Sequence, residues 1–222
     1  MNSMKHGIRQ LVFRSGVVAV IVALVPIAQV SASMPQTPTE SVRSTIEDVV
    51  HILTNSELKQ PAHLTERRQE IERVIRERVS YEDMAKQALG AQWLSLADSE
   101  RQEFVDLFVQ LLRDSFAGKI DSYVDERVLF LSEEQSDRFA EVRTKLSGRK
   151  TDTRLDFRMT DHDGMWLVYD VVIDGASIVQ NYRAQFASII RSASYSGLVE
   201  RMRAKTFIVK GFEVHTVAAP VF

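Results

Sequence analysis

The segment FAEVRTKL, residues 139–146, decides the fold. Apolar and polar side chains alternate along it, and a period of two is typical of a β-strand with one buried face. The alternation predicts strands at residues 127–131, 139–146, 154–159 and 165–173. Turn signals at 148–152 and 161–164 lie between strands, and links this short favour antiparallel pairing in a meander.

Helical periodicity flanks the meander on both sides. Helices are predicted at about 42–53, 64–79, 81–89, 101–116, 177–191 and 196–205. Ser80 with Asp83 forms a capping box, and Gly90 should close the same helix in a left-handed conformation. Ser95 with Asp98 repeats the capping signal. The order of elements predicts an α+β fold, with a twisted antiparallel sheet covered by several helices.

The first residues have the layout of a cleavable signal peptide. Lys5, Arg9 and Arg14 precede an acid-free apolar run that ends before Val30-Ser31-Ala32. That run is about 11 residues long, whereas a membrane-spanning helix needs roughly 20. We therefore expect cleavage after Ala32. The predicted division is a signal peptide at 1–32, one domain at 33–205 and an apolar extension at 206–222.

Charge and composition exclude several classes of function. Removal of residues 1–32 leaves 25 basic and 30 acidic residues, a net charge of −5, which argues against a nucleic-acid partner. The chain has no Cys, so it has neither a disulfide nor a thiolate metal site. It also lacks the HExxH, phosphate-loop and dinucleotide motifs, so no metal or cofactor is expected.

Catalysis also has little support. Ser177 follows Gly175-Ala176, but Val179 stands where a nucleophile elbow needs its second glycine, and a helix cap explains the serine. His162 lies between two aspartates in a predicted turn and is interpreted as solvated. We therefore expect a protein that is not an enzyme.

The segment YEDMAKQALGAQW, residues 81–93, resembles the early signature of the toluene-tolerance family, which includes the Mla lipid carriers. Further matches follow in the family's order at 103–104, 111–112, 166–171, 174–177 and 181–186. The resemblance implies a periplasmic phospholipid carrier with an apolar cavity between sheet and helices. It also implies two partners, an inner-membrane ABC transporter complex with a lipid-binding periplasmic subunit and an outer-membrane lipoprotein complex.

The candidate lipid-binding residues are the apolar side chains that should face this cavity. They are Met84, Leu89, Trp93, Phe104, Phe108, Leu112, Phe157, Val168, Val171, Ile178, Tyr182 and Phe186. Spacing alone favours an ordinary core for them, the family resemblance favours a cavity, and the two have the same composition. Arg183 is the candidate for the headgroup or the cavity mouth, with a structural ion pair as the alternative.

Other interpretations stay open at this point. The domain could be an exported interaction module with a filled core, or a periplasmic hydrolase that acts on lipid. A rigid terpenoid lipid such as a hopanoid could replace the phospholipid. The extension at 206–222 could be a lid, a tail that contacts a partner or an edge strand, and we favour the strand because Phe207 and Val209 alternate with Ile208 and Lys210.

Overall fold

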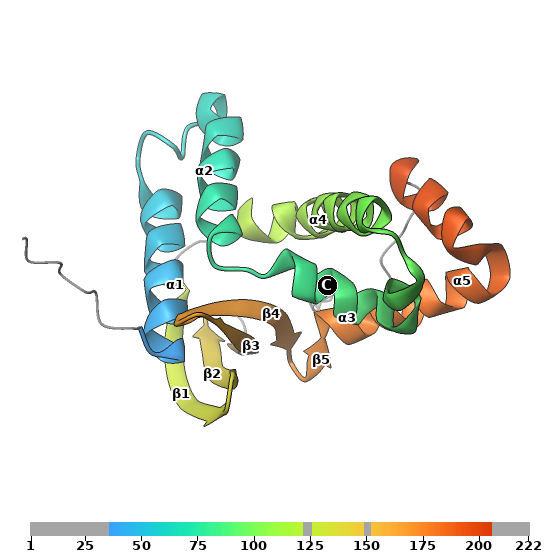
Figure 1. Ribbon diagram of the computed structural model, residues 1–222. Helices are drawn as coiled ribbons and strands as arrows, with labels where there is room; N and C mark the ends of the chain where they lie inside the picture. Colours follow the sequence, from blue (N-terminus) through green and yellow to red (C-terminus); the bar gives the residue numbers. More distant parts are fainter. Residues whose placement is uncertain (1–35, 122–125, 149–151, 206–222) are drawn as a thin grey trace, which may run out of the picture. The chain divides into compact units, whose positions relative to one another are not determined.

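A five-stranded antiparallel sheet forms the β layer of the computed structural model, which describes residues 36–121, 126–148 and 152–205 (Figure 1). The strands pair in chain order: β1 (Arg127–Ser136), β2 (Phe139–Ser147), β3 (Asp152–His162), β4 (Met165–Ile173) and β5 (Ala176–Ser177). The predicted meander is confirmed, and β1 and β3 are longer than expected. The predicted signal peptide and the 206–222 extension lie outside the described residues.

Tight turns set the register of the sheet. Asp163-Gly164 joins β3 to β4, and Asp174-Gly175 joins β4 to β5, with positive φ at both residues of each pair. Two such residues are what a type I′ hairpin turn requires, and glycine adopts this conformation at no steric cost. The side chain of Asp161 accepts the Gly164 N–H at 2.7 Å and closes the first turn.

The helices agree with the predicted α+β order. They are α1 (Pro38–Thr54), α2 (Leu64–Arg76), α3 (Tyr81–Leu89), α4 (Asp98–Asp121) and α5 (Ile178–Arg203), with short 3₁₀ turns η1 (Pro61–His63) and η2 (Gly90–Ser95). The two predicted C-terminal helices are continuous in α5 except at Ser194, whose φ of 66° and ψ of 174° are not helical.

The predicted caps are only partly correct. Ser80 Oγ accepts the Asp83 N–H at 3.3 Å, but the Ser80 N–H donates to Val168 O, so the reciprocal half of the capping box is missing. Gly90 has positive φ, but its ψ of −134° is not left-handed helical. The second box is wrong, because the Ser95 hydroxyl donates to Gln92 O inside η2.

Three apolar clusters hold these elements together. One joins α3, α4 and α5 through Phe104, Phe108, Tyr182 and Phe186, and we call it the helical core. A second packs Val42 of α1 against one face of the sheet, which we call the inner face. The third lies between α1 and α2. The opposite face of the sheet, the outer face, carries mainly charged side chains, so the apolar layer lies on the inner face.

Candidate functional site

The inner face divides into a buried part and a half-buried part. Ala140, Val142, Met159 and Val168 are buried beneath α1. Beyond them, strand register aligns a continuous apolar surface that is only half-buried. We call it the inner-face patch; it consists of Val128, Phe130, Leu146, Leu155, Phe157, Val171 and Ile173. Because large apolar side chains are normally covered in a finished core, this patch is the candidate apolar binding surface.

The patch connects the sheet to both apolar clusters. Val171 and Ile173 pack against the helical core, whereas Phe130 and Phe157 pack against the α1 cluster. The Arg43 guanidinium of α1 lies 4.0 Å from the centre of the Phe130 ring, a cation–π contact that covers one edge of the patch. The patch therefore borders both sets of helices.

The predicted lipid-binding residues fall into three groups. Phe157 and Val171 belong to the inner-face patch, and Val168 is buried in the α1 cluster. The remaining residues belong to the helical core: Met84, Leu89, Trp93, Phe104, Phe108, Leu112, Ile178, Tyr182 and Phe186. The sequence missed the other patch residues, although the alternation along β2 and β3 could have identified Leu146 and Leu155.

Four aromatic rings at the centre of the helical core pack directly against one another. The Phe108 ring lies 5.2 Å from Tyr182 and 5.9 Å from Phe186, both edge to face, and 6.1 Å from Phe104. All four side chains have 0 % exposure. A side chain that borders a space wide enough for water would keep accessible area, so in this structure these rings contact only protein.

Arg183 lies on the exposed side of α5, next to the end of α3. A Cβ built on Gly90 would lie 3.2 Å from its Nε, so the guanidinium stacks closely over the glycine. Arg183 forms no ion pair among the described residues. No acidic side chain among the described residues therefore neutralises its charge, and packing against Gly90 sets its position.

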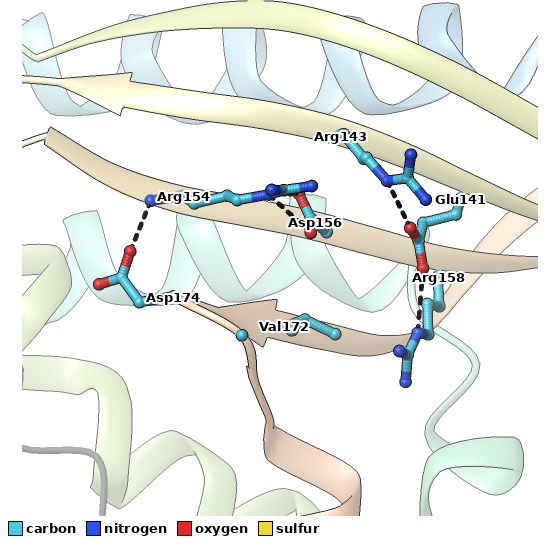
Figure 2. Close-up of a pocket in the computed structure, with 8 residues that line it drawn as sticks. Glu141, Arg143, Arg154, Asp156, Arg158, Val172 and Asp174 are labelled. Atoms are coloured by element: carbon cyan, nitrogen blue, oxygen red, sulfur yellow. Dashed lines mark hydrogen bonds and ion pairs between the residues drawn. The ribbon is translucent and has the colours of Figure 1, made fainter.

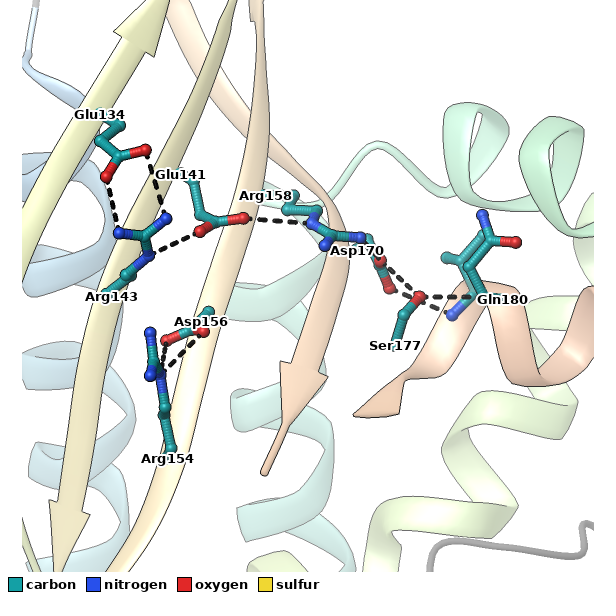
Figure 3. A network of polar contacts seen from close by, with 10 residues as sticks. Glu134, Glu141, Arg143, Arg154, Asp156, Arg158, Asp170, Ser177 and Gln180 are labelled. Carbon is teal, nitrogen blue, oxygen red and sulfur yellow. Dashed lines mark hydrogen bonds and ion pairs between the residues drawn. The ribbon is translucent and has the colours of Figure 1, made fainter. Parts of the chain in front are cut away.

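The outer face carries an open groove of about 580 Å³ that is lined by charged side chains (Figure 2). Ion pairs cross it: Arg143 bridges Glu134 and Glu141, and Arg158 bridges Glu141 and Asp170 (Figure 3). Burial tends to raise the pKa of Glu141, but hydrogen bonds from the two arginines outweigh it and lower the pKa. Such a lining is unsuited to hydrocarbon, so the groove is not the apolar site.

Asp170 joins this network to the start of α5. Its Oδ1 accepts the Val179 N–H at 3.1 Å, and its Oδ2 accepts the Ser177 hydroxyl at 2.6 Å. Ser177 Oγ in turn accepts the Gln180 N–H at 3.0 Å, so the predicted helix cap is confirmed. The sequence did not single out Asp170 as the carboxylate that fixes the helix N-terminus.

His162, predicted to be a solvated turn residue, is 38% exposed but is the last residue of β3 and makes a long-range contact. Its Nε2 lies 2.9 Å from Asp83 Oδ2, across from the β3–β4 hairpin to the first turn of α3. Residues 78–80 run along the edge of β4, through the Val79–Val168 bridge, and bring α3 to the hairpin. A contact 79 residues apart in sequence has no local signal.

None of the helices within residues 36–121, 126–148 and 152–205 combines the length and apolar character that a membrane span needs. In the same residues, no three His, Asp or Glu side chains form a group that could hold a metal ion.

The fold and the inner-face patch define an α+β protein with an apolar surface between a sheet and its covering helices. The chain belongs to the MlaC protein family, whose family model matches residues 43–204. The resemblance to Mla-type carriers is therefore confirmed.

One similar solved structure is the phospholipid-binding protein from Ralstonia solanacearum, determined in complex with a phospholipid. The TM-score is 0.70 at 23% sequence identity, and the match covers 77% of this chain and 97% of that chain. At this identity the likeness establishes the fold, and the predicted fold class is confirmed. No curated protein matches the sequence.

Proposed function

We propose that this chain carries a phospholipid in the periplasm, with the acyl chains against the inner-face patch. The observation that carries the proposal is the patch itself, which is apolar, continuous across four strands and only half-buried. Membership of the MlaC family supports lipid binding, and the Ralstonia protein of similar fold was determined with a phospholipid bound.

Burial of hydrocarbon supplies the driving force. Each methylene removed from water contributes about 0.8 kcal/mol, so two chains of about fifteen carbons contribute on the order of 20 kcal/mol before the ordering costs of binding. Leu146 and Leu155 lie in neither buried cluster and are half-buried, so a bound chain would cover them further. A binding protein of this kind needs no cofactor and no chemical step.

The remaining predicted residues take different parts in this proposal. Phe157 and Val171 contact the acyl chains. The helical-core residues Phe104, Phe108, Tyr182 and Phe186 do not, because their rings are fully buried against one another; they stabilise the helices next to the patch. Arg183 is exposed and unpaired among the described residues, and its charge is available to an acidic ligand or partner at the cavity mouth.

The family resemblance supports a place for the carrier between two membranes. We propose that lipid passes between an inner-membrane ABC transporter complex with a lipid-binding periplasmic subunit and an outer-membrane lipoprotein complex. Export would depend on the predicted signal peptide at 1–32.

Mass spectrometry of an organic extract of the purified protein tests the ligand. We expect a stoichiometric phospholipid. A hopanoid or other terpenoid in its place would change the ligand class, no stoichiometric lipid would favour an interaction domain, and free fatty acids would favour a hydrolase.

A matched pair of variants tests the site. Leu155→Asn places an amide on the inner-face patch, whereas Leu129→Asn places one on the exposed outer face of the same sheet. We expect Leu155→Asn to lose most of the bound lipid and Leu129→Asn to keep it, with both variants folded by circular dichroism. Equal lipid content in the two variants would remove the patch from the proposal.

A further inference from the structure

Two arginines from different helices converge on one carboxylate oxygen at the end of α2. Arg76 Nη2 donates to Glu72 Oε1 at 2.7 Å, and Arg113 Nη2 of α4 donates to the same oxygen. Glu72 and Arg76 lie one turn apart on α2, whereas Arg113 is 41 residues further along the chain. The two guanidinium groups are therefore held by a single acceptor oxygen.

Tyr81, the first residue of α3, is the fourth member of this group. Burial raises the pKa of Tyr81, and Arg76, Glu72 and Arg113 are the charged groups close enough to act on it. Its side chain packs against the helical core, while its hydroxyl makes no hydrogen bond among the described residues. We call Glu72, Arg76, Tyr81 and Arg113 the Glu72 cluster.

The Glu72 cluster has one positive charge in excess. Two guanidinium groups share one carboxylate, and the nearby acids Glu70 and Glu77 pair with Arg73 instead. Neither arginine uses Nε or Nη1 in a hydrogen bond among the described residues. The cluster thus offers several N–H donors and a hydroxyl to one further anion.

The cluster also adjoins apolar side chains. Leu112 belongs to the helical core and Leu111 packs against it, and both directly precede Arg113 on α4. Tyr81 joins the same core on the α3 side. Tyr81 and Leu111 are only partly buried, so an anion bound here would lie beside partly exposed apolar side chains.

We propose that the Glu72 cluster is the subsite for the phosphodiester of the bound lipid, an inference that rests on the proposed function. Guanidinium groups bind phosphate oxygens through paired N–H donors, and Tyr81 adds an O–H donor. A phosphodiester carries a single negative charge at neutral pH, which matches the excess charge of the cluster. Arg183 lies next to Gly90 at the other end of α3 and takes no part in this subsite.

The test measures headgroup preference separately from acyl-chain binding. Phosphatidylglycerol and diacylglycerol with identical acyl chains compete for the delipidated protein, and native mass spectrometry gives the ratio of the two affinities. We expect Arg76→Ala and Arg113→Ala each to lower the preference for phosphatidylglycerol by roughly five- to tenfold, with little change for diacylglycerol. Tyr81→Phe should lower it by a smaller factor.

Controls on the same helices make the result specific. Arg73 and Arg76 are both on α2, both 61% exposed and both paired with a glutamate, so Arg73→Ala removes the same charge outside the cluster. We expect Arg73→Ala to leave the preference unchanged. Glu72→Gln keeps both arginines and removes one negative charge, so it should raise the preference for phosphatidylglycerol.

Different results would overturn the subsite and the proposed function. An unchanged preference in Arg76→Ala and Arg113→Ala, or an equal loss in Arg73→Ala, would overturn the subsite. The cluster would instead be a site for free phosphate if inorganic phosphate bound tightly without lipid and the variants kept their preference for phosphatidylglycerol. That result would also overturn the lipid subsite. Wild-type protein that binds neither lipid would instead refute the proposed function.

Discussion

The Ser177 hydroxyl donates a 2.6 Å hydrogen bond to Asp170, a carboxylate on β4 that is only 2% exposed. Together with the Val179 N–H and Arg158, this bond satisfies Asp170 from three directions. One buried acid thus fixes the start of α5 to the sheet.

Asp170→Ala should therefore be strongly destabilising. It leaves the α5 N-terminus without its acceptor and Arg158 without a buried partner, at a cost of about 2–4 kcal/mol. Urea unfolding measures this free energy. Glu134→Ala, at the exposed end of the same ion-pair network, should cost less than about 1 kcal/mol. Similar losses in both variants would contradict the role of Asp170.

Acid should weaken the outer-face network through Glu141. Its pKa lies below the usual 4.5 because hydrogen bonds from Arg143 and Arg158 outweigh the effect of burial. A carboxylate with a lowered pKa in the folded state stabilises the protein above its unfolded pKa, and this stability is lost as the pH falls through the folded value. We expect unfolding free energy to decrease below about pH 4.5, and Glu141→Gln should flatten that decrease. Parallel curves for wild type and variant would rule this out.

Substitution of Phe108 should mainly reduce stability, whereas substitution of Phe157 should mainly reduce the amount of bound lipid. Phe108→Ala opens a cavity in the closed aromatic core and should cost about 3–5 kcal/mol in stability. Phe157→Ala changes a half-buried patch residue, so it should cost less stability and release more lipid. Thermal unfolding and lipid content, measured on both variants, check the pair. Greater lipid loss in folded Phe108→Ala would place the acyl chains in the helical core.

A side chain at Gly90 should be unfavourable, both because of the backbone conformation and because Arg183 lies close to it. The Gly90 φ of 63° disfavours alanine, and a Cβ would approach Arg183 Nε to 3.2 Å. We expect Gly90→Ala to cost about 1–2 kcal/mol, and Arg183→Ala should recover the part due to crowding. A double-mutant cycle measures that coupling. Strict additivity would show that backbone conformation alone sets the cost.

Ser194→Gly should stabilise the protein. Ser194 adopts φ 66° and ψ 174°, a region that is almost exclusive to glycine and costs a serine about 1–3 kcal/mol. Ser192→Gly, in the regular part of α5, should instead destabilise by about 1 kcal/mol. Opposite shifts in melting temperature are the expected result, and a lower melting temperature in Ser194→Gly would disprove strain at this residue.

Local patterns predicted the elements, whereas long-range contacts determined the site. Alternation along 139–146 and the Asp-Gly pairs contain enough information for strands and turns, because both depend on neighbouring residues. The sequence could not distinguish fully buried rings such as Phe108 from half-buried residues such as Leu155, since both are apolar at regular spacing. The convergence of Arg113 on Glu72 depends on how α4 packs near α2, and no local pattern encodes that.

The order of the strands bears on how the chain reaches its structure. Every strand pairs with its neighbour in sequence, and β3, β4 and β5 are joined by two-residue turns. Pairings between close neighbours close only short loops, and topologies rich in them fold fast because little chain entropy is lost before the first contacts form. The meander can therefore assemble early and act as the template on which α5 and the N-terminal helices later dock.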